Sequence, residues 1–296
     1  MSSIASELLE ALRLANTAAT RRADRVRRAR VLAHLTWPGR AVLAPRLGRP
    51  LTFNHIVVKV PLDDAARHSI EAQVIEQLDA LATPAMGEPV EWEGPWGMPT
   101  RGWSGALRVE QGDYELTVVF SARPELTLDT EWFAGLFEIV LRPARARLHA
   151  LHVTIDWIGS RSRLRSLRLA AEAGHVVSAG RGVPLSTGSE LDSLLLGGQQ
   201  SERRAVVSHS RPRGRSLSWQ AMFTSGAARA IGPQIRDSTD FRRTVVELAA
   251  DIVDFVEIDS TGTRVRSPWW VAQRSQLISA GLGRTRNPAR HRQSQD

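Results

Sequence analysis

The stretch of sequence that decides the fold is Gly197-Gly198-Gln199-Gln200-Ser201-Glu202-Arg203-Arg204, which leads into the apolar run Ala205-Val206-Val207. Paired glycines are typical of a turn, because they adopt left-handed backbone angles without steric cost. The β-branched residues after them favour a strand, which ends in Ser208-His209-Ser210. The stretch therefore predicts a glycine turn that feeds a strand, with the apolar run Leu194-Leu195-Leu196 before it.

Patterns typical of strands and helices alternate along the rest of the chain. Period-2 alternation and β-branched residues predict strands at 52–60, 106–110, 114–120, 148–158, 205–209 and 216–223. Helical spacing of apolar residues predicts helices at 63–78, 130–141, 162–173, 224–232 and 238–254. Segments rich in glycine predict loops at 87–105 and 180–190. This order favours an α+β fold with a central antiparallel sheet or sheets and packed helices, and it indicates a duplicated sheet-plus-helix unit.

Composition and punctuation divide the chain into three parts. A chain of 296 residues that is 42% hydrophobic and 24% charged is too apolar to be mainly disordered. Residues 1–50 predict one or two basic amphipathic helices and a linker that is broken by prolines. We expect residues 51–278 to form the α+β body and residues 279–296 to form a disordered basic tail.

The positive charge of the chain comes almost entirely from arginine. The formal net charge is +8 at pH 7, and Lys59 is the only lysine. The planar, five-donor guanidinium suits phosphate groups and base edges, so this bias is compatible with nucleic-acid binding. A high-GC genome explains the ratio of arginine to lysine equally well, but it does not explain the net positive excess.

Several classes of protein are excluded by residues that the chain lacks. It has no cysteine, which excludes disulfides, thiolate zinc sites and cysteine nucleophiles. It has no window of about 18 apolar residues and no signal-peptide pattern, so we expect no membrane association and a bacterial cytoplasmic location.

Four segments, taken in order, resemble the replication initiation factor family, the initiators and relaxases of rolling-circle plasmids, phages and conjugative elements. They are the strand Leu151-His152-Val153-Thr154-Ile155-Asp156-Trp157, the glycine turn with Ser201-Glu202-Arg203-Arg204, the helix that runs into Asp254-Phe255-Val256, and Pro268-Trp269-Trp270. The resemblance covers roughly residues 51 to 275. It implies a nucleic-acid-binding scaffold.

The resemblance also implies a reaction, and several of its residues are missing. In the family a tyrosine hydroxyl attacks a DNA phosphate, which is polarised by a divalent metal held by carboxylates. The tyrosine position falls near Ser208, Asp156 keeps one metal position, and the second aspartate position falls near Ser160. The strand that usually carries Arg-x-Glu corresponds to 215–220, which has no carboxylate. We therefore expect no cofactor, and Mg²⁺ or Mn²⁺ only if nicking is retained.

Two other residues are candidate nucleophiles. Tyr114, the only tyrosine, falls in a predicted hairpin strand, where a buried packing role is the expectation. Ser208 precedes His209, but neighbouring strand residues point to opposite faces, which disfavours a serine and base pair. His149 and His152 lie three apart and would bracket a metal only on a helix.

Arginines gather after two of the strands that carry the resemblance. They are predicted to contact nucleic acid and consist of Arg161, Arg163, Arg165, Arg203, Arg204, Arg211, Arg213 and Arg215. If the two groups line one groove, they give sequence-tolerant, salt-sensitive affinity for phosphates. The alternative is a set of solvated loop arginines.

Three functions follow from these observations. The first is a DNA-binding protein of initiator ancestry without nicking activity, which acts on single-stranded or origin-like DNA in the replication, maintenance or regulation of a mobile element. The second is an active nickase or relaxase with a displaced tyrosine. The third is a scaffold or interaction protein whose arginines contact an acidic protein, and a homodimer or protein partner stays open.

Overall fold

The computed structural model describes residues 50–62, 67–94, 97–158, 161–178, 187–190, 193–197, 201–209 and 216–283. The chain divides into two units, Met1–Leu43 and Ala44–Asp296, and all of the described residues belong to the second. The predicted N-terminal helices and most of the predicted basic tail lie outside these residues. Within the described ranges, no helix is both long and apolar enough to cross a membrane.

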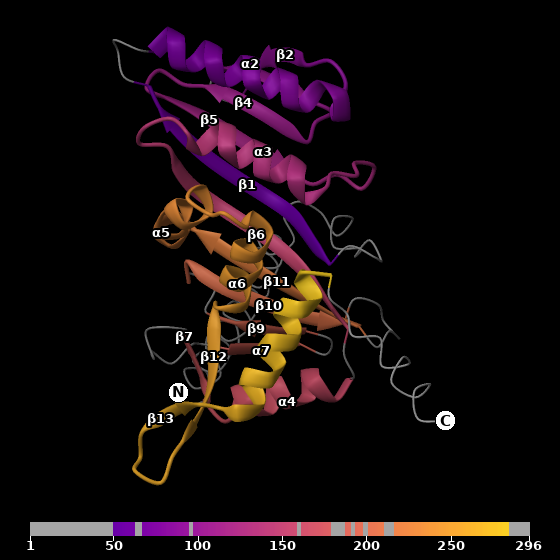
Figure 1. Ribbon diagram of the computed structural model, residues 1–296, viewed down its shortest axis with the longest axis vertical. Coiled ribbons are helices and arrows are strands. Elements are labelled where there is room, and N and C mark those ends of the chain that lie inside the picture. The colour runs from indigo at the N-terminus through magenta and orange to yellow at the C-terminus, as the bar shows by residue number, and fades with distance from the viewer. Residues whose placement is uncertain are drawn as a thin grey trace, which may run out of the picture. The chain divides into compact units, whose positions relative to one another are not determined.

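A ten-stranded antiparallel sheet forms the centre of the second unit (Figure 1), with the strand order β2-β3-β4-β5-β1-β6-β11-β10-β9-β8. Its strands are β1 (Leu51–Pro61), β2 (Val90–Glu93), β3 (Pro99–Trp103), β4 (Leu107–Gln111), β5 (Glu115–Ser121), β6 (Arg147–Ile158), β8 (Thr187–Glu190), β9 (Ser193–Leu196), β10 (Arg203–His209) and β11 (Ser216–Thr224). A smaller sheet has the order β13-β12-β7. It consists of β7 (Val176–Ser178), β12 (Val253–Ile258) and β13 (Arg264–Arg266).

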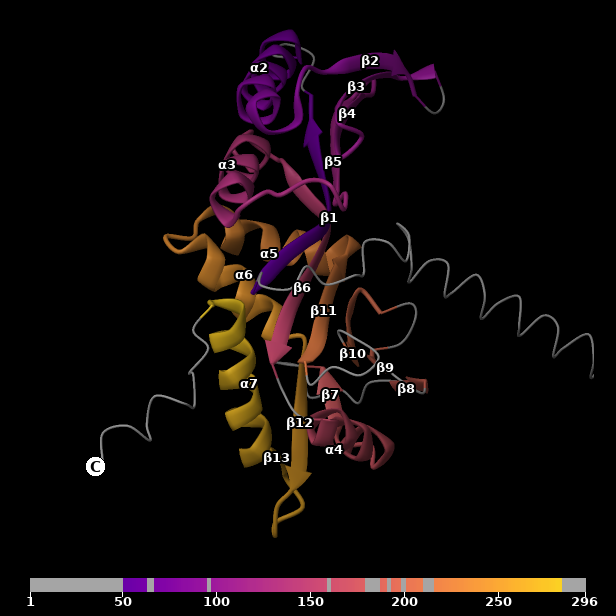
Figure 2. The same cartoon turned by 90° about the vertical axis from the view of Figure 1, so that its right-hand side faces the viewer.

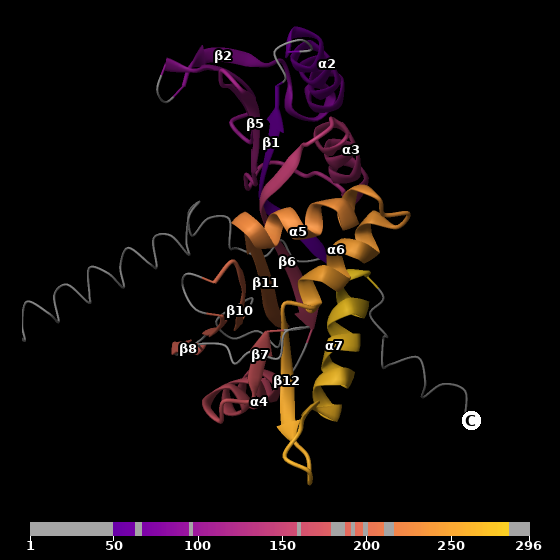
Figure 3. The same cartoon turned by 90° about the vertical axis from the view of Figure 1, so that its left-hand side faces the viewer.

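Six helices accompany these strands in the described part of the chain. They are α2 (Arg67–Met86), α3 (Thr130–Leu141), α4 (Arg161–Glu172), α5 (Ser225–Arg236), α6 (Phe241–Ala250) and α7 (Pro268–Gly281). Helices α3, α5, α6 and α7 pack against the central strands β1, β6 and β11. Figures 2 and 3 show these helices together on one side of those strands.

The large sheet is built from two similar halves. Strand β1 is followed by α2, the meander β2 to β5 and then α3, whereas β6 is followed by α4, the strands β8 to β11 and then α5. The two leading strands are antiparallel neighbours at the middle of the sheet. This arrangement confirms the predicted α+β fold and its duplicated sheet-plus-helix unit, with a pseudo-twofold axis between β1 and β6.

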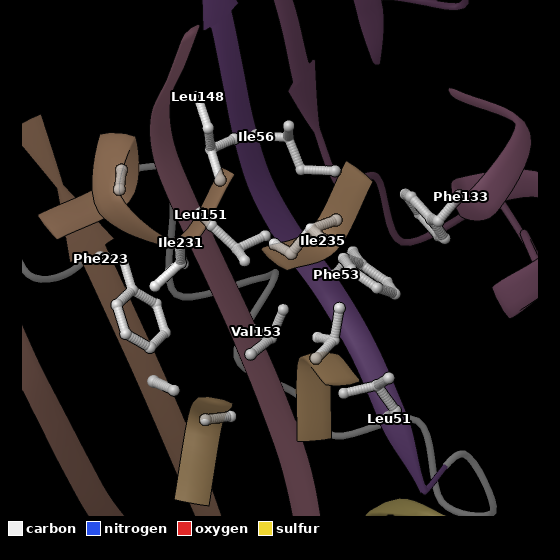
Figure 4. Packing of buried hydrophobic residues seen from close by; sticks show 14 of the residues in the cluster. Leu51, Phe53, Ile56, Phe133, Leu148, Leu151, Val153, Phe223, Ile231 and Ile235 are labelled. Atoms are coloured by element: carbon white, nitrogen blue, oxygen red, sulfur yellow. The ribbon is translucent and has the colours of Figure 1, made fainter. Parts of the chain in front are cut away.

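Alternation along β6 separates an apolar face from a polar one. Leu151, Val153, Ile155 and Trp157 are buried on the side of the helices and belong to the hydrophobic core of the domain. Figure 4 shows Leu151 close to Ile231 and Ile235 of helix α5, with Val153 farther along the same strand. The residues between them point to the other face of the sheet.

The predicted loops are the first sequence-based assignments that the structure corrects. The predicted loop at 87–105 contains β2 and β3, which form a hairpin at the sheet edge. Its glycines favoured a loop, but a Cβ at Gly102 would lie 2.4 Å from the ring of Trp92, so glycine is needed there for close packing. The predicted loop at 180–190 contains β8 (Thr187–Glu190).

Towards the C-terminus, the helix predicted to reach residue 254 ends at Ala250 and gives way to strand β12. Its apolar spacing continues into the β-branched run Val253–Ile258, so the periodicity alone did not locate the boundary. Helix α7 continues to Gly281 and so includes the first three residues of the expected basic tail, 279–281.

Candidate functional site

One row of polar residues crosses the second half of the sheet, and we call it the Asp156 row. Asp156 on β6 pairs with Ser218 on β11, Ser218 pairs with Ser208 on β10, and Ser208 pairs with Ser193 on β9. Directly opposed residues of antiparallel strands project from the same face, about 5 Å apart. Asp156 and Ser208 are therefore about 10 Å apart on the face opposite the helices.

The row brings together positions that the resemblance singled out separately. Asp156 was the residual metal position, Ser208 was the tyrosine position, and Ser218 lies in the strand expected to carry Arg-x-Glu. Ser160, the second aspartate position, lies outside the described residues. All three described positions fall in one register row, and only one of them carries a carboxylate.

Asp156 is a partly buried carboxylate with little to compensate its charge. Its Oδ1 is shielded from solvent and has no hydrogen-bond partner within the described ranges. Burial raises the pKa of Asp156 from 3.8 to about 6, because the ionised form loses hydration. No group of three or more metal-binding side chains occurs in the part of the chain that the structure describes.

A second row crosses the same face four residues earlier on β6, and we call it the His152 row. In register it contains Arg204 on β10, Met222 on β11, His152 on β6, His55 on β1 and Ser121 on β5. The two imidazole rings lie 5.4 Å apart, centroid to centroid. His55 Nδ1 lies 3.1 Å from the hydroxyl of Ser121, within hydrogen-bond distance.

The electrostatics of the His152 row keep its imidazoles neutral. Burial lowers the pKa of His152 to about 3, with smaller contributions from His55 and Arg204. Burial also lowers the pKa of His55, and the charge of Arg108 adds to that effect. Arg204 itself is half-buried, and its burial lowers the pKa of the guanidinium.

The glycine turn and its Ser-Glu-Arg segment have a structural role. Gly197 has a φ of +100°, and a Cβ there would lie 2.8 Å from the carbonyl oxygen of Arg203. The carboxylate of Glu202 accepts hydrogen bonds from the backbone N–H groups of Gly226 (3.2 Å) and Ala227 (3.0 Å), at the start of α5. Glu202 thus caps α5, which has no side-chain cap at Thr224.

The predicted DNA-binding arginines fall in different places. Arg203 and Arg204 are both half-buried, and as neighbours on β10 they point to opposite faces, so only Arg204 shares a face with Asp156. Arg165 is exposed on α4. Arg161 and Arg163 belong to the first turn of α4, but their side chains lie outside the described part, as do all of Arg211, Arg213 and Arg215.

Tyr114 is not part of either row. The expectation of a buried side chain was wrong, because Tyr114 is 77% exposed at the turn between β4 and β5. Its carbonyl oxygen accepts from the N–H of Leu62, whereas the N–H of Asp156 donates to Pro50 at the other end of β1. At about 3.3 Å per residue, these ends of β1 are roughly 35 Å apart. His149 and His152 both lie on strand β6 rather than on a helix, and a register shift beside Ala150 separates them.

Comparison with known proteins supports the resemblance at the level of the fold. No family model and no curated protein matches the sequence. A solved structure, the rolling circle replication initiator protein from Geobacillus stearothermophilus, superposes with a TM-score of 0.52 and 12% sequence identity. The match covers 77% of this chain and 96% of that chain. The chain therefore has the fold of a rolling-circle replication initiator.

Proposed function

We propose that this protein binds DNA through the polar face of the second half of the sheet, without nicking activity of its own, in the replication, maintenance or regulation of a mobile element. The observation that carries the proposal is the Asp156 row, in which a single carboxylate lies among serine hydroxyls. The initiator fold supports the choice of DNA as the partner.

The chemistry of the row favours binding over cutting. Strand nicking of the family type needs an activated hydroxyl beside a divalent metal that several acidic oxygens hold. Ser208 has no adjacent base on its own face, because His209 projects from the opposite side of β10. One carboxylate and neutral hydroxyls form a weak ligand set for Mg²⁺ or Mn²⁺. The residues of the row thus do not fit a catalytic metal centre.

The same face offers groups that suit a nucleic-acid backbone. Serine, threonine and glutamine side chains donate to phosphate and sugar oxygens, and Arg204 supplies a positive charge. Thr154 and Gln220 form a register pair on this face beside the Asp156 row. Among the described residues, the second half of this face is largely neutral and carries one arginine, which predicts modest, sequence-tolerant affinity with a shallow dependence on salt.

The test is a mobility shift with single-stranded and duplex DNA over a series of salt concentrations. Arg204→Gln is expected to weaken binding and to reduce the slope of log K against log[salt] by about 0.7 to 0.9. Arg142→Gln is the matched control, because Arg142 follows helix α3 on the other side of the sheet and pairs only with Glu138 among the described side chains. Absence of salt-dependent binding to both kinds of DNA would refute the proposal.

Two further measurements separate the alternative functions. Incubation with supercoiled plasmid and Mg²⁺ or Mn²⁺ detects nicking, and a covalent adduct that is lost in Tyr114→Phe would establish an active nickase instead. Purification of the chain with one stoichiometric protein and no nucleic acid would favour a scaffold.

A further inference from the structure

The His152 row contains a buried donor or acceptor that has no hydrogen-bond partner among the described residues. His152 Nε2 is shielded from solvent and has no hydrogen-bond partner in the described part of the chain. A buried polar atom without a partner loses the hydration that it had in the unfolded chain, so such atoms commonly mark a site for a ligand or a water molecule. Arg204 lies two strands away in the same row.

The charges around His152 favour an anion over a cation. Burial is the largest cause of the lowered pKa of His152, and the positive charge of Arg204 lowers it further, so a cationic side chain acts on the imidazole. Along β6 the nearest carboxylate on this face is Asp156, four residues or about 13 Å away. A neutral imidazole N–H and a guanidinium both donate hydrogen bonds, so the complementary ligand is an oxyanion.

Arg204 has no charged counterpart at the equivalent position of this row in the first half of the sheet. The pseudo-twofold axis relates His55 to His152, because these two residues are register partners on β1 and β6, the paired leading strands of the two halves. In the first half, the residue opposite Ser121 on the β4 side is Ala106, whose carbonyl accepts from the N–H of Ser121. In the second half, the equivalent position holds Arg204. The row is therefore chemically asymmetric, and its charged end lies beside the strands of the Asp156 row.

We propose that the His152 row is a phosphate-binding site, in which His152 and Arg204 donate to one backbone phosphate of the bound DNA strand. This inference rests on the proposed function and specifies where the strand is held. The strand then runs along β6, with a phosphate at His152 and its sugar and base groups beside the hydroxyls and the amide near Asp156. Asp156 lies about 13 Å along β6 from His152, so its carboxylate is well separated from the phosphate.

Inorganic phosphate tests the site without DNA. In the full chain labelled with ¹⁵N, the imidazole resonances of His152 are expected to move on titration with phosphate, whereas those of the exposed His149 are not. Arg204→Gln is expected to abolish the movement. If the imidazole resonances of His152 do not move when phosphate is added, only water occupies the site and the proposal is overturned.

DNA binding then tests the role of the site. His152→Leu removes the donor and is expected to weaken binding about tenfold without changing the salt slope, because a neutral donor releases no counterion. His152→Gln keeps an N–H in a similar place and is expected to restore most of the affinity, and His149→Gln is the control. If His152→Leu does not fold, two measurements still test the site. They are the DNA affinity of His152→Gln and the phosphate titration of the unmodified chain.

The outcomes separate this inference from the proposed function. If the chain binds DNA and His152→Leu binds equally well, the phosphate site is refuted and the proposed function stands. If phosphate moves the resonances of His152 but no DNA binds, the proposed function and the DNA strand are refuted, and the row remains an anion site.

Discussion

Replacing Asp156 with asparagine should stabilise the protein at neutral pH. The carboxylate has a pKa of about 6 in the folded chain, against an ordinary value of 3.8. A folded pKa that is raised means that the folded state holds the proton more tightly, so stability is lost as pH rises from about 4 to about 6. At 1.36 kcal/mol per pH unit the loss is about 3 kcal/mol, and the partial exposure of Asp156 reduces it to about 1 to 2 kcal/mol.

Urea denaturation at several pH values measures this effect. Asp156→Asn should unfold at a higher urea concentration than the parent chain at pH 7.5, and the difference should shrink towards zero near pH 4. Ser218→Ala, which changes the neighbouring residue of the same row, is the control and should not alter the pH dependence. A parent chain that is as stable as Asp156→Asn at pH 7.5 would refute the reasoning. If Mg²⁺ or Mn²⁺ stabilised the parent chain and left the variant unchanged, Asp156 would be a metal ligand after all.

Three other substitutions test the description of the site and its supports. Gly197→Ala should cost about 2 to 3 kcal/mol of unfolding free energy, because the position has a positive φ and its new Cβ would contact a carbonyl oxygen. The control is Gly174→Ala, which should cost only about 1 kcal/mol, because Gly174 has a φ of +74° and nothing lies near its Cβ. Glu202→Gln should lose about 1 kcal/mol by weakening the cap of α5, and an unchanged melting temperature would contradict that role. His152→Gln, made in the Asp156→Asn background, should flatten the loss of stability below pH 6.5, because the folded chain excludes a proton from His152 down to a pKa of about 3. The effect amounts to about 5 kcal/mol at most, and a loss as steep as in Asp156→Asn alone would argue against it.

Local patterns predicted much of the fold. Helix α3 has the predicted bounds, because Asp129 accepts a hydrogen bond from the N–H of Trp132 and an apolar stripe follows directly. The β4–β5 hairpin also formed where the polar turn at 111–113 separates two alternating runs. The β2–β3 hairpin was missed because its glycines favour a loop, and the close approach of Trp92 to Gly102 is a contact across strands that local propensity does not contain.

The rows of the candidate site could not be predicted from single segments of the sequence. The sequence predicted strands around Asp156, Ser208 and Ser218, but only their register places them in one row, and register is a property of strand pairs. The His152 row was missed for the same reason. A signal was nevertheless present, since the segments His55-Ile56-Val57-Val58-Lys59 and His152-Val153-Thr154-Ile155-Asp156 place histidine and a charged residue at the same spacing.

That spacing makes Lys59 the counterpart of Asp156 across the pseudo-twofold axis, and the two halves treat these charges differently. Lys59 forms an ion pair with Glu115, and Glu110 in the same row of the first half pairs with Arg108 at 2.7 Å. The row of the first half is therefore a set of compensated surface charges. Asp156 faces hydroxyls instead and destabilises the fold when it ionises. Because the same scaffold accommodates a neutralised row at the equivalent position, the fold does not require an uncompensated carboxylate at Asp156, and this supports the proposed binding of DNA on that face.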